Sequence, residues 1–225
     1  MMTLFNASGV SASHKIYLIH GFAGLGIEML KIERALLNEG FNTEIYTYPS
    51  LSEDIDSVSL HLYRHILKEK PDTISFVTHS MGALVARSVY RWIDTTQHFP
   101  FIHRMVMIAP PNKGTPVADF FVGSRIARFL GGPNVDNLTT DRIFGASRYP
   151  IPDCKVGILL GVGGNRRGYN LFLEENNDGL ILPEDARLGN EEDLAFVKAS
   201  HLQILFKRRS ISLIKSFLHT GKFTD

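Results

Sequence analysis

The sequence predicts an α/β fold in which a mostly parallel β-sheet is flanked by helices. Segments with strand character alternate with segments of helical periodicity along the chain, which is the pattern of parallel α/β architecture. The predicted strands are apolar along nearly their whole length, as expected where both faces of a sheet are buried. With 225 residues, the chain can bury a sizeable core. We expect a single domain over residues 1–225.

The first part of the chain supplies strands and helices in turn. Residues 15–19 form an apolar run that predicts a strand, and residues 27–40 have helical spacing that stops at a glycine, a common helix terminator. A second strand is predicted at residues 43–48. Apolar residues then recur at helical spacing over residues 55–66, and this helix closes before Pro71.

The same alternation continues in the second part. A strand at residues 73–77 leads directly into a helix at residues 83–87. The last segment, residues 202–218, predicts a helix with Leu202, Phe206, Leu213 and Phe217 on one face. The remaining strands are predicted at residues 103–109, 155–162 and 194–198.

A serine stands where the strand at residues 73–77 passes into its helix. Residues 78–82 read Thr-His-Ser-Met-Gly, with Ser80 at the centre. A strand that turns at once into a helix around a serine is the setting of a nucleophile elbow, in which the hydroxyl is forced up out of the sheet. A serine at this place can also be a simple helix N-cap. The surrounding motif favours a nucleophile and predicts acyl transfer through a serine ester.

One position departs from the elbow pattern G-x-S-x-G. Thr78 stands where glycine is favoured, because that residue crowds the elbow helix. A β-branched residue is natural at the end of a strand. We therefore expect the elbow to form with slight adjustment.

Two further residues follow Ser80 in the chain order Ser, Asp, His. Asp178 lies in an Asn-Asn-Asp-Gly segment and His201 follows the last predicted strand. Each comes after a strand, so each is expected on a loop at the carboxyl edge of the sheet, where sites form in open α/β folds. Asp178 could instead build an Asx turn, and His201 could cap the final helix. Other acidic candidates are Glu174, Glu175, Asp185 and the more distant Asp153.

Five segments spread over most of the chain together point to a known family. They are His20-Gly21-Phe22 and residues 78–82, 109–116, 177–179 and 200–201. Through them the chain resembles a small α/β-hydrolase of the lipase/esterase type. The resemblance implies a serine hydrolase that cleaves carboxylic esters of hydrophobic acyl groups, through a Ser-His-Asp triad and an acyl-enzyme intermediate. No metal or organic cofactor is needed for this chemistry.

Each group has a role that its chemistry allows. Ser80 would attack an acyl carbonyl once His201 takes its proton, while Asp178 would hold the imidazole tautomer and stabilise the imidazolium. The oxyanion needs backbone donors, for which the N–H of Met81 is the first candidate. The N–H of Phe22 as second donor is implied by the resemblance.

The stretch between Pro111 and Pro152 has no strand pattern and is rich in glycine, proline and asparagine. Residues 117–130 within it predict a helix, although Arg125 interrupts its apolar stripe. The resemblance implies a cap or lid insertion over residues 112–152, whose aromatic side chains contact the acyl chain. An ordinary helix packed on the sheet is an equal alternative. The substrate-contact candidates are Phe120, Phe121 and Phe129.

Two other functions remain open. A thioesterase or an acyltransferase would use the same three residues. A non-catalytic α/β-hydrolase scaffold that binds a ligand or partner is the alternative from another class. Thr78 is the feature that favours it.

Composition sets limits on partners and location. A net charge of +1 gives no electrostatic reason to expect nucleic acid or an anionic membrane. One cysteine, Cys154, allows no internal disulfide and no cysteine metal cluster. The N-terminal residues lack a signal-peptide pattern and no stretch is long enough to cross a membrane. We expect a cytoplasmic protein acting on a small acyl ester or lipid, with its oligomeric state open.

Overall fold

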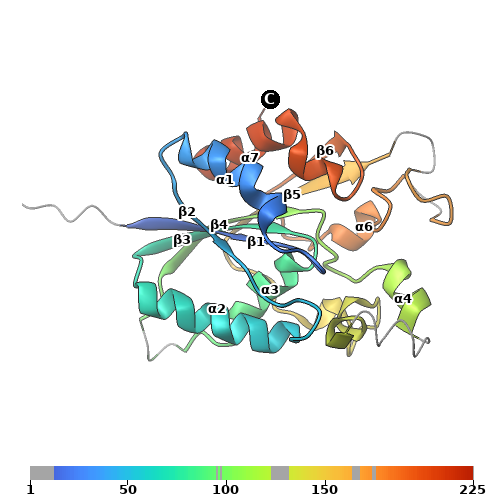
Figure 1. Cartoon of the computed structure of the whole chain (residues 1–225), viewed down its shortest axis with the longest axis horizontal. Helices are drawn as coiled ribbons and strands as arrows, with labels where there is room; N and C mark the ends of the chain where they lie inside the picture. The colour runs from blue at the N-terminus through green and yellow to red at the C-terminus, as the bar shows by residue number, and fades with distance from the viewer. Residues whose placement is uncertain are drawn as a thin grey trace, which may run out of the picture.

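The computed structural model describes residues 13–224 apart from residues 95, 97, 123–131, 164–167 and 174–175. At its centre is a six-stranded sheet, parallel throughout, with strand order β2-β1-β3-β4-β5-β6 (Figure 1). The predicted α/β fold is therefore confirmed. The strands are β1 (His14–Ile19), β2 (Asn42–Tyr46), β3 (Thr73–His79), β4 (Phe101–Ile108), β5 (Lys155–Val162) and β6 (Asp193–Lys198).

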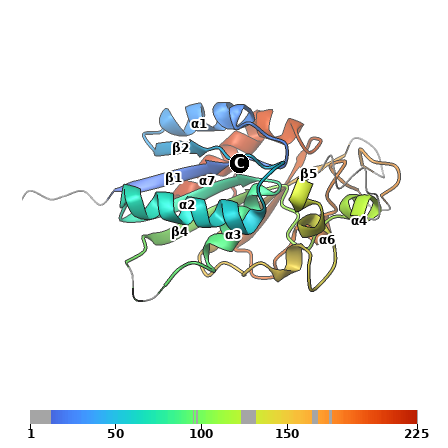
Figure 2. The same ribbon diagram turned by 60° about the horizontal axis from the view of Figure 1, so that its bottom comes forward.

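Helices cover both faces of this sheet. One face carries α1 and α7, and the other carries α2 and α3 (Figures 1 and 2). The α-helices are α1 (Leu30–Leu37), α2 (Ile55–Glu69), α3 (Gly82–Val89), α4 (Pro116–Val122), α6 (Pro183–Ala186) and α7 (Arg208–Thr220). Short 3₁₀ turns are η1 (Ile27–Met29), η2 (Gly132–Asn134), η3 (Asp136–Leu138), η4 (Ala146–Arg148) and η5 (Gln203–Phe206).

The strands are apolar on both faces because each face has its own core. In β1, Tyr17 and Ile19 belong to the core under α2 and α3, whereas Ile16 and Leu18 belong to the core under α1 and α7. All four side chains are fully buried. Alternate residues of a strand point to opposite faces, so burial on both faces gives the continuous apolar runs seen in the sequence.

The C-terminal helix differs from its prediction. It consists of η5 and α7, separated at Lys207, whose backbone is extended with φ −73° and ψ 134°. Leu202 and Phe206, predicted to share the buried face, are exposed. The tighter 3₁₀ turn rotates the chain so that Ile204 and Leu205 reach the core instead.

The segment between β4 and β5 is attached to the core by two buried side chains. Arg87 on α3 donates hydrogen bonds to carbonyl oxygens at both ends of the segment, those of Asn112, Tyr149 and Pro150. Asn134 donates to two carbonyl oxygens before α2 and accepts the N–H of Ile55 at 3.0 Å. The described parts of residues 112–152 contain α4 and three 3₁₀ turns, without a named strand. The predicted helix over residues 117–130 is α4 as far as Val122, and its remainder lies outside the described residues.

Among the described residues, no helix combines the length and the apolar character needed to span a membrane.

Candidate active site

Ser80 sits in a strained turn between β3 and α3. Its φ is 51°, in the left-handed region that residues with a side chain rarely adopt. Its N–H donates to the carbonyl of Ile108 at 2.9 Å, which continues the sheet pairing past the end of β3. Two residues later α3 begins at Gly82. A serine held in this conformation between a strand and a helix has the geometry of a nucleophile elbow.

Two glycines allow the elbow to approach the end of β1. A Cβ on Gly82 would lie 2.5 Å from the carbonyl oxygens of Ile19 and His20. A Cβ on Gly21 would lie 2.9 Å from the Cβ of Ser80. The last position of the elbow pattern therefore has to be glycine for a steric reason.

Thr78 fits into the sheet at the first position of the pattern. It is fully buried, pairs with Ile19 and Met107 in the neighbouring strands, and its Oγ1 donates to the carbonyl of Val106 at 3.4 Å. Its hydroxyl is thus directed at the adjacent strand β4.

Asp178 and His201 form a buried hydrogen-bonded pair. The Nδ1 of His201 lies 2.7 Å from Oδ2 of Asp178, and the backbone N–H of His201 donates to the Asp178 carbonyl at 2.8 Å. The other carboxylate oxygen, Oδ1, accepts the N–H groups of Leu180 at 2.9 Å and Ile181 at 2.8 Å. The Asx turn and the pairing with His201 were alternative interpretations of the sequence. One carboxylate makes both sets of contacts, one with each oxygen.

The other acidic candidates lie elsewhere. Asp185 belongs to the short helix α6, and Asp153 precedes β5 at the opposite edge of the sheet. Glu174 and Glu175 are outside the described residues.

His79 connects the serine turn to the histidine loop. Its Nε2–H donates to the backbone carbonyl of His201 at 3.0 Å, and the two imidazole ring centroids are 4.8 Å apart. Burial, and then the nearby His201, lower the pKa of His79 to about 3. The ring is therefore neutral near pH 7.

His20 fixes the loop that follows β1. Its Nε2 accepts the backbone N–H of Tyr48 at 3.2 Å, so its Nδ1 carries the proton and donates to the carbonyl of Gly21 at 2.8 Å. The ring stacks on Tyr48 at a centroid distance of 4.1 Å, and the Tyr48 hydroxyl donates to the His20 carbonyl at 2.7 Å. Burial lowers the pKa of His20. The sequence gives no indication of this role for Tyr48, because the residue only ends a strand-like run.

A largely apolar cavity of about 380 Å³ opens at Ser80. Phe22 and Phe121 contribute to its wall, whereas Phe120 is 82% exposed and is not among its lining residues. Successive residues of a helix point about 100° apart, so only one of these neighbours faces inward. Phe129 lies outside the described residues. The other lining residues are Pro111, Thr115, Val117, Ala118, Val135, Leu138, Leu180 and Ile181.

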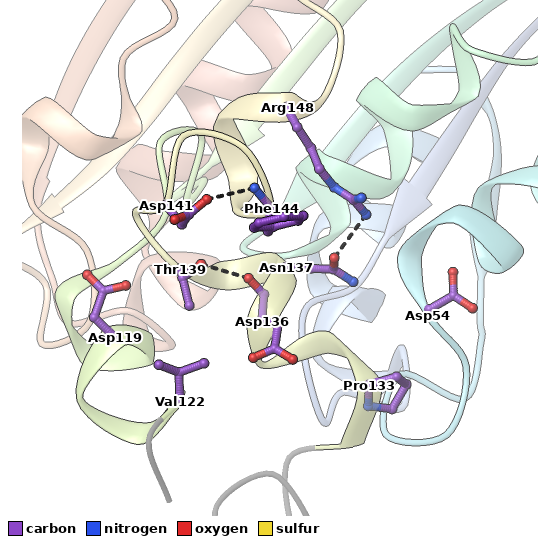
Figure 3. A pocket seen from close by; sticks show the side chains of 10 residues that line it. All are labelled: Asp54, Asp119, Val122, Pro133, Asp136, Asn137, Thr139, Asp141, Phe144 and Arg148. Carbon is purple, nitrogen blue, oxygen red and sulfur yellow. Dashed lines mark hydrogen bonds between the residues drawn. The ribbon is translucent and has the colours of Figure 1, made fainter.

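A second cavity, of about 680 Å³, is lined by Asp119 and Val122 of α4 and by residues of the segment that follows it (Figure 3). Four aspartates line it: Asp54, Asp119, Asp136 and Asp141. Asp54 accepts the N–H of Ser57 at the start of α2, Asp119 accepts the N–H of Thr140, and Asp141 accepts the N–H of Phe144. Within the described ranges, no group of three or more His, Cys, Asp or Glu side chains is arranged to hold a metal ion.

Comparison with solved structures identifies the fold. A lipase from Bacillus licheniformis, BlEst2 in its mature form, superposes with a TM-score of 0.69 at 20% sequence identity, over 92% of this chain and 91% of the lipase chain. The chain has the α/β-hydrolase fold. A metagenomic carboxyl esterase, MGS0156, has a similar fold, with a TM-score of 0.66 and 18% identity, over 86% of this chain and 66% of the esterase.

A type II thioesterase has a comparable fold. BorB, from the borrelidin biosynthetic cluster, has a TM-score of 0.60 and 15% identity, with 92% of each chain covered. No protein-family model matches the sequence, and no curated protein matches it. At these identities the similarity concerns the α/β-hydrolase fold itself.

Proposed function

We propose that this α/β-hydrolase is a serine hydrolase that cleaves carboxylic esters of hydrophobic acyl groups. One observation carries the proposal. Ser80, at a φ of 51°, opens into an apolar cavity, and it follows the carboxyl end of a strand of the parallel sheet, as the buried Asp178–His201 pair does. An elbow serine with a histidine–aspartate pair is the arrangement used for acyl transfer on this fold.

The histidine tautomer favours a base role for His201. Asp178 is an acceptor only, so the proton on the facing nitrogen of His201 is on Nδ1 and Nε2 is left as the basic nitrogen. Nε2 takes the proton from the Ser80 hydroxyl as Oγ attacks the acyl carbonyl. The resulting imidazolium is stabilised by the Asp178 carboxylate. His201 then returns the proton to the departing alcohol, and a water molecule cleaves the acyl-enzyme by the same steps.

Two backbone amides support the oxyanion in this proposal. Met81 follows Ser80 in the turn before α3, and Phe22 lies in the loop that His20 fixes. Phe22 and Ser80 line the same cavity, which supports a position of the loop close to the reacting carbonyl. Preorganised donors of this kind stabilise charge that develops in the transition state.

The cavity supports an apolar acyl group as the part of the substrate that is recognised. Its wall combines Phe22 from the loop after β1, Val117 and Phe121 from α4, and Ile181 from the loop that carries Asp178. Burial of an alkyl chain against such a wall is favourable by about 25 cal/mol per Å² of apolar surface removed from water.

A thioester substrate is the second candidate. It is favoured by the similarity to the thioesterase BorB over 92% of both chains. The same nucleophile and base would serve, since only the leaving group differs. Comparing matched acyl oxoesters and thioesters decides between the two.

Labelling with a fluorophosphonate probe tests the reaction class. Wild type is expected to gain one adduct by intact mass, and Ser80→Ala and His201→Ala are expected to gain none. Ser52→Ala, at an exposed serine, is the matched control and should label as wild type does. A folded wild type that neither labels nor cleaves short or long acyl esters would contradict the proposal and favour the non-catalytic scaffold.

A further inference from the structure

Large apolar side chains are exposed on α4 and on segments that contact α4 or the loop that carries Asp178. Six of them form what we call the apolar belt: Phe120, Ile143, Phe144, Leu171, Phe172 and Leu180. Phe172 is 96% exposed and Phe120 is 82% exposed. Single exposed apolar residues are common on protein surfaces, but a group gathered at one place marks an interaction site.

Hydrogen bonds join the belt to the cavity on the side of the loop that carries Asp178. Leu180 lines the cavity itself. The side-chain amide of Asn170 donates to the carbonyl of Gly179 at 3.2 Å, and its Oδ1 accepts the N–H of Phe172 at 3.0 Å. The segment that carries Leu171 and Phe172 is therefore fastened beside Leu180.

The belt is equally joined to the cavity on the side of α4. The Phe120 ring packs edge-on against Phe121, a cavity-lining residue, at 5.4 Å between centroids. Asp119 of α4 accepts the N–H of Thr140 at 2.8 Å, and Asp119 and Phe144 line one common cavity (Figure 3). Phe144 thus lies beside α4, at the cavity shown in Figure 3, while Phe120, through Phe121, and Leu180 lie next to the Ser80 cavity.

We propose that the apolar belt docks this enzyme onto the surface of an uncharged or zwitterionic lipid layer. This inference rests on the proposed ester hydrolysis and identifies the lipid surface as the place where the enzyme binds its substrate. An acyl chain leaving the lipid can enter the apolar cavity at Ser80 without crossing water, because the belt and the cavity wall share Leu180 and the Phe120–Phe121 contact. Apolar side chains at the level of the head groups provide the binding free energy.

The charges beside the belt decide which lipid surface fits. Asp54, Asp119, Asp136 and Asp141 line the cavity next to Phe144 together with the cation Arg148, and Arg142 is exposed in the same turn. Anionic lipid attracts clusters of lysine and arginine. Among the described residues of this flank, the four carboxylates outnumber the two cations. With a net charge of only +1 for the whole chain, this favours a layer without net charge.

Co-sedimentation with phosphatidylcholine vesicles tests the inference. The wild type is expected to sediment with the vesicles, and the double variant Phe144→Ser/Phe172→Ser should bind roughly tenfold more weakly, because two exposed rings no longer enter the lipid. The matched control is Phe101→Ser. Phe101 is 66% exposed but begins β4 at the opposite edge of the sheet, so its variant should bind as wild type does.

Fluorophosphonate labelling in the same preparations separates this inference from the proposed function. A wild type that labels but does not sediment, or whose sedimentation is unchanged in the double variant, overturns the docking surface while ester hydrolysis stands. A wild type that sediments through the belt but does not label supports the surface and contradicts ester hydrolysis. Two results together would place the contact elsewhere. One is stronger binding to phosphatidylglycerol vesicles than to phosphatidylcholine vesicles, and the other is a loss of that binding in Phe101→Ser as large as in the double variant.

Discussion

The two sides of the Ser80 cavity are built in different ways. One side consists of Ser80 and of Leu180 and Ile181, whose N–H groups donate to Asp178. It is held by backbone hydrogen bonds and by glycines at steric contact, and Asp178 is only 1% exposed. The side with α4 is a helix of seven residues, whose Phe121 is 45% exposed although it lines the cavity.

This difference indicates how the two sides respond to substitution. A group that must be placed for a reaction needs neighbours that lock its position. A wall that only excludes water can change shape at little cost in stability, and loops and short elements on a rigid scaffold commonly vary in this way. Changes on the first side should abolish the reaction or unfold the chain, whereas changes on the second should alter substrate preference.

Asp178→Asn is expected to have the largest effect on turnover. An asparagine amide can donate to Nδ1 and stabilise the wrong tautomer of His201, so kcat should fall by roughly 10³–10⁴-fold with little change in folding. Asp185→Asn is the matched control, since that carboxylate lies in α6. Steady-state kinetics on a soluble ester measures both. A near-normal rate for Asp178→Asn would assign the role to another acid.

Gly82→Ala should damage both stability and rate. The added Cβ would lie 2.5 Å from two backbone carbonyl oxygens, which cannot move aside as a flexible side chain would. We expect a loss of about 1–3 kcal/mol in the free energy of unfolding, measured by urea denaturation, together with a lower kcat. Gly40→Ala is the control, because nothing lies within 4 Å of its Cβ and only its φ of 85° is unfavourable. It should cost about 1 kcal/mol and leave kcat unchanged.

Local sequence patterns were sufficient for the sheet and for the order of the three candidate residues. Each apolar run became a strand because both faces of the sheet are covered, and Asp178 stands in a turn whose chemistry is local. The contact between His79 and His201 joins residues 122 apart in the chain and depends on how two loops meet. The prediction of the buried face of the last helix was wrong, because the 3₁₀ turn η5 changes the helical period before α7. Tertiary contacts of this kind leave no periodic signal.

His79→Phe should lower kcat by roughly tenfold. The His201 carbonyl loses a hydrogen bond of about 1–1.5 kcal/mol, so the loop that carries His201 is held less firmly. His79→Gln keeps an N–H donor and should recover part of the rate. The measurement is the rate of fluorophosphonate labelling at Ser80 in wild type and in both variants. Equal losses for both variants would indicate that the ring is needed only for packing.

The same residue predicts a pH dependence of stability. The pKa of His79 falls from 6.5 to about 3 in the folded chain, so below pH 6.5 the unfolded chain binds a proton that the folded chain does not. Stability should therefore fall as the pH drops from 6.5 toward 3, by up to about 1.4 kcal/mol per pH unit from this group. His20, whose pKa burial also lowers, adds a loss of the same sign. Urea denaturation at pH 7 and pH 5 should show a smaller difference in His79→Gln than in wild type. An unchanged difference would contradict the assignment.

The smallest expected effect is on acyl preference, and two adjacent residues of α4 separate it from lipid docking. Phe121→Ala enlarges the cavity, so kcat/KM should shift toward longer acyl chains in a series of soluble esters. The shift should be a few-fold, since an apolar pocket discriminates a methylene by only about 1–3 kcal/mol. Phe120→Ala removes a ring that does not line the cavity, so its chain-length preference should stay that of wild type while its vesicle binding falls. If both variants change chain-length preference alike, α4 presents both rings to the substrate and the distinction between cavity wall and docking surface is lost.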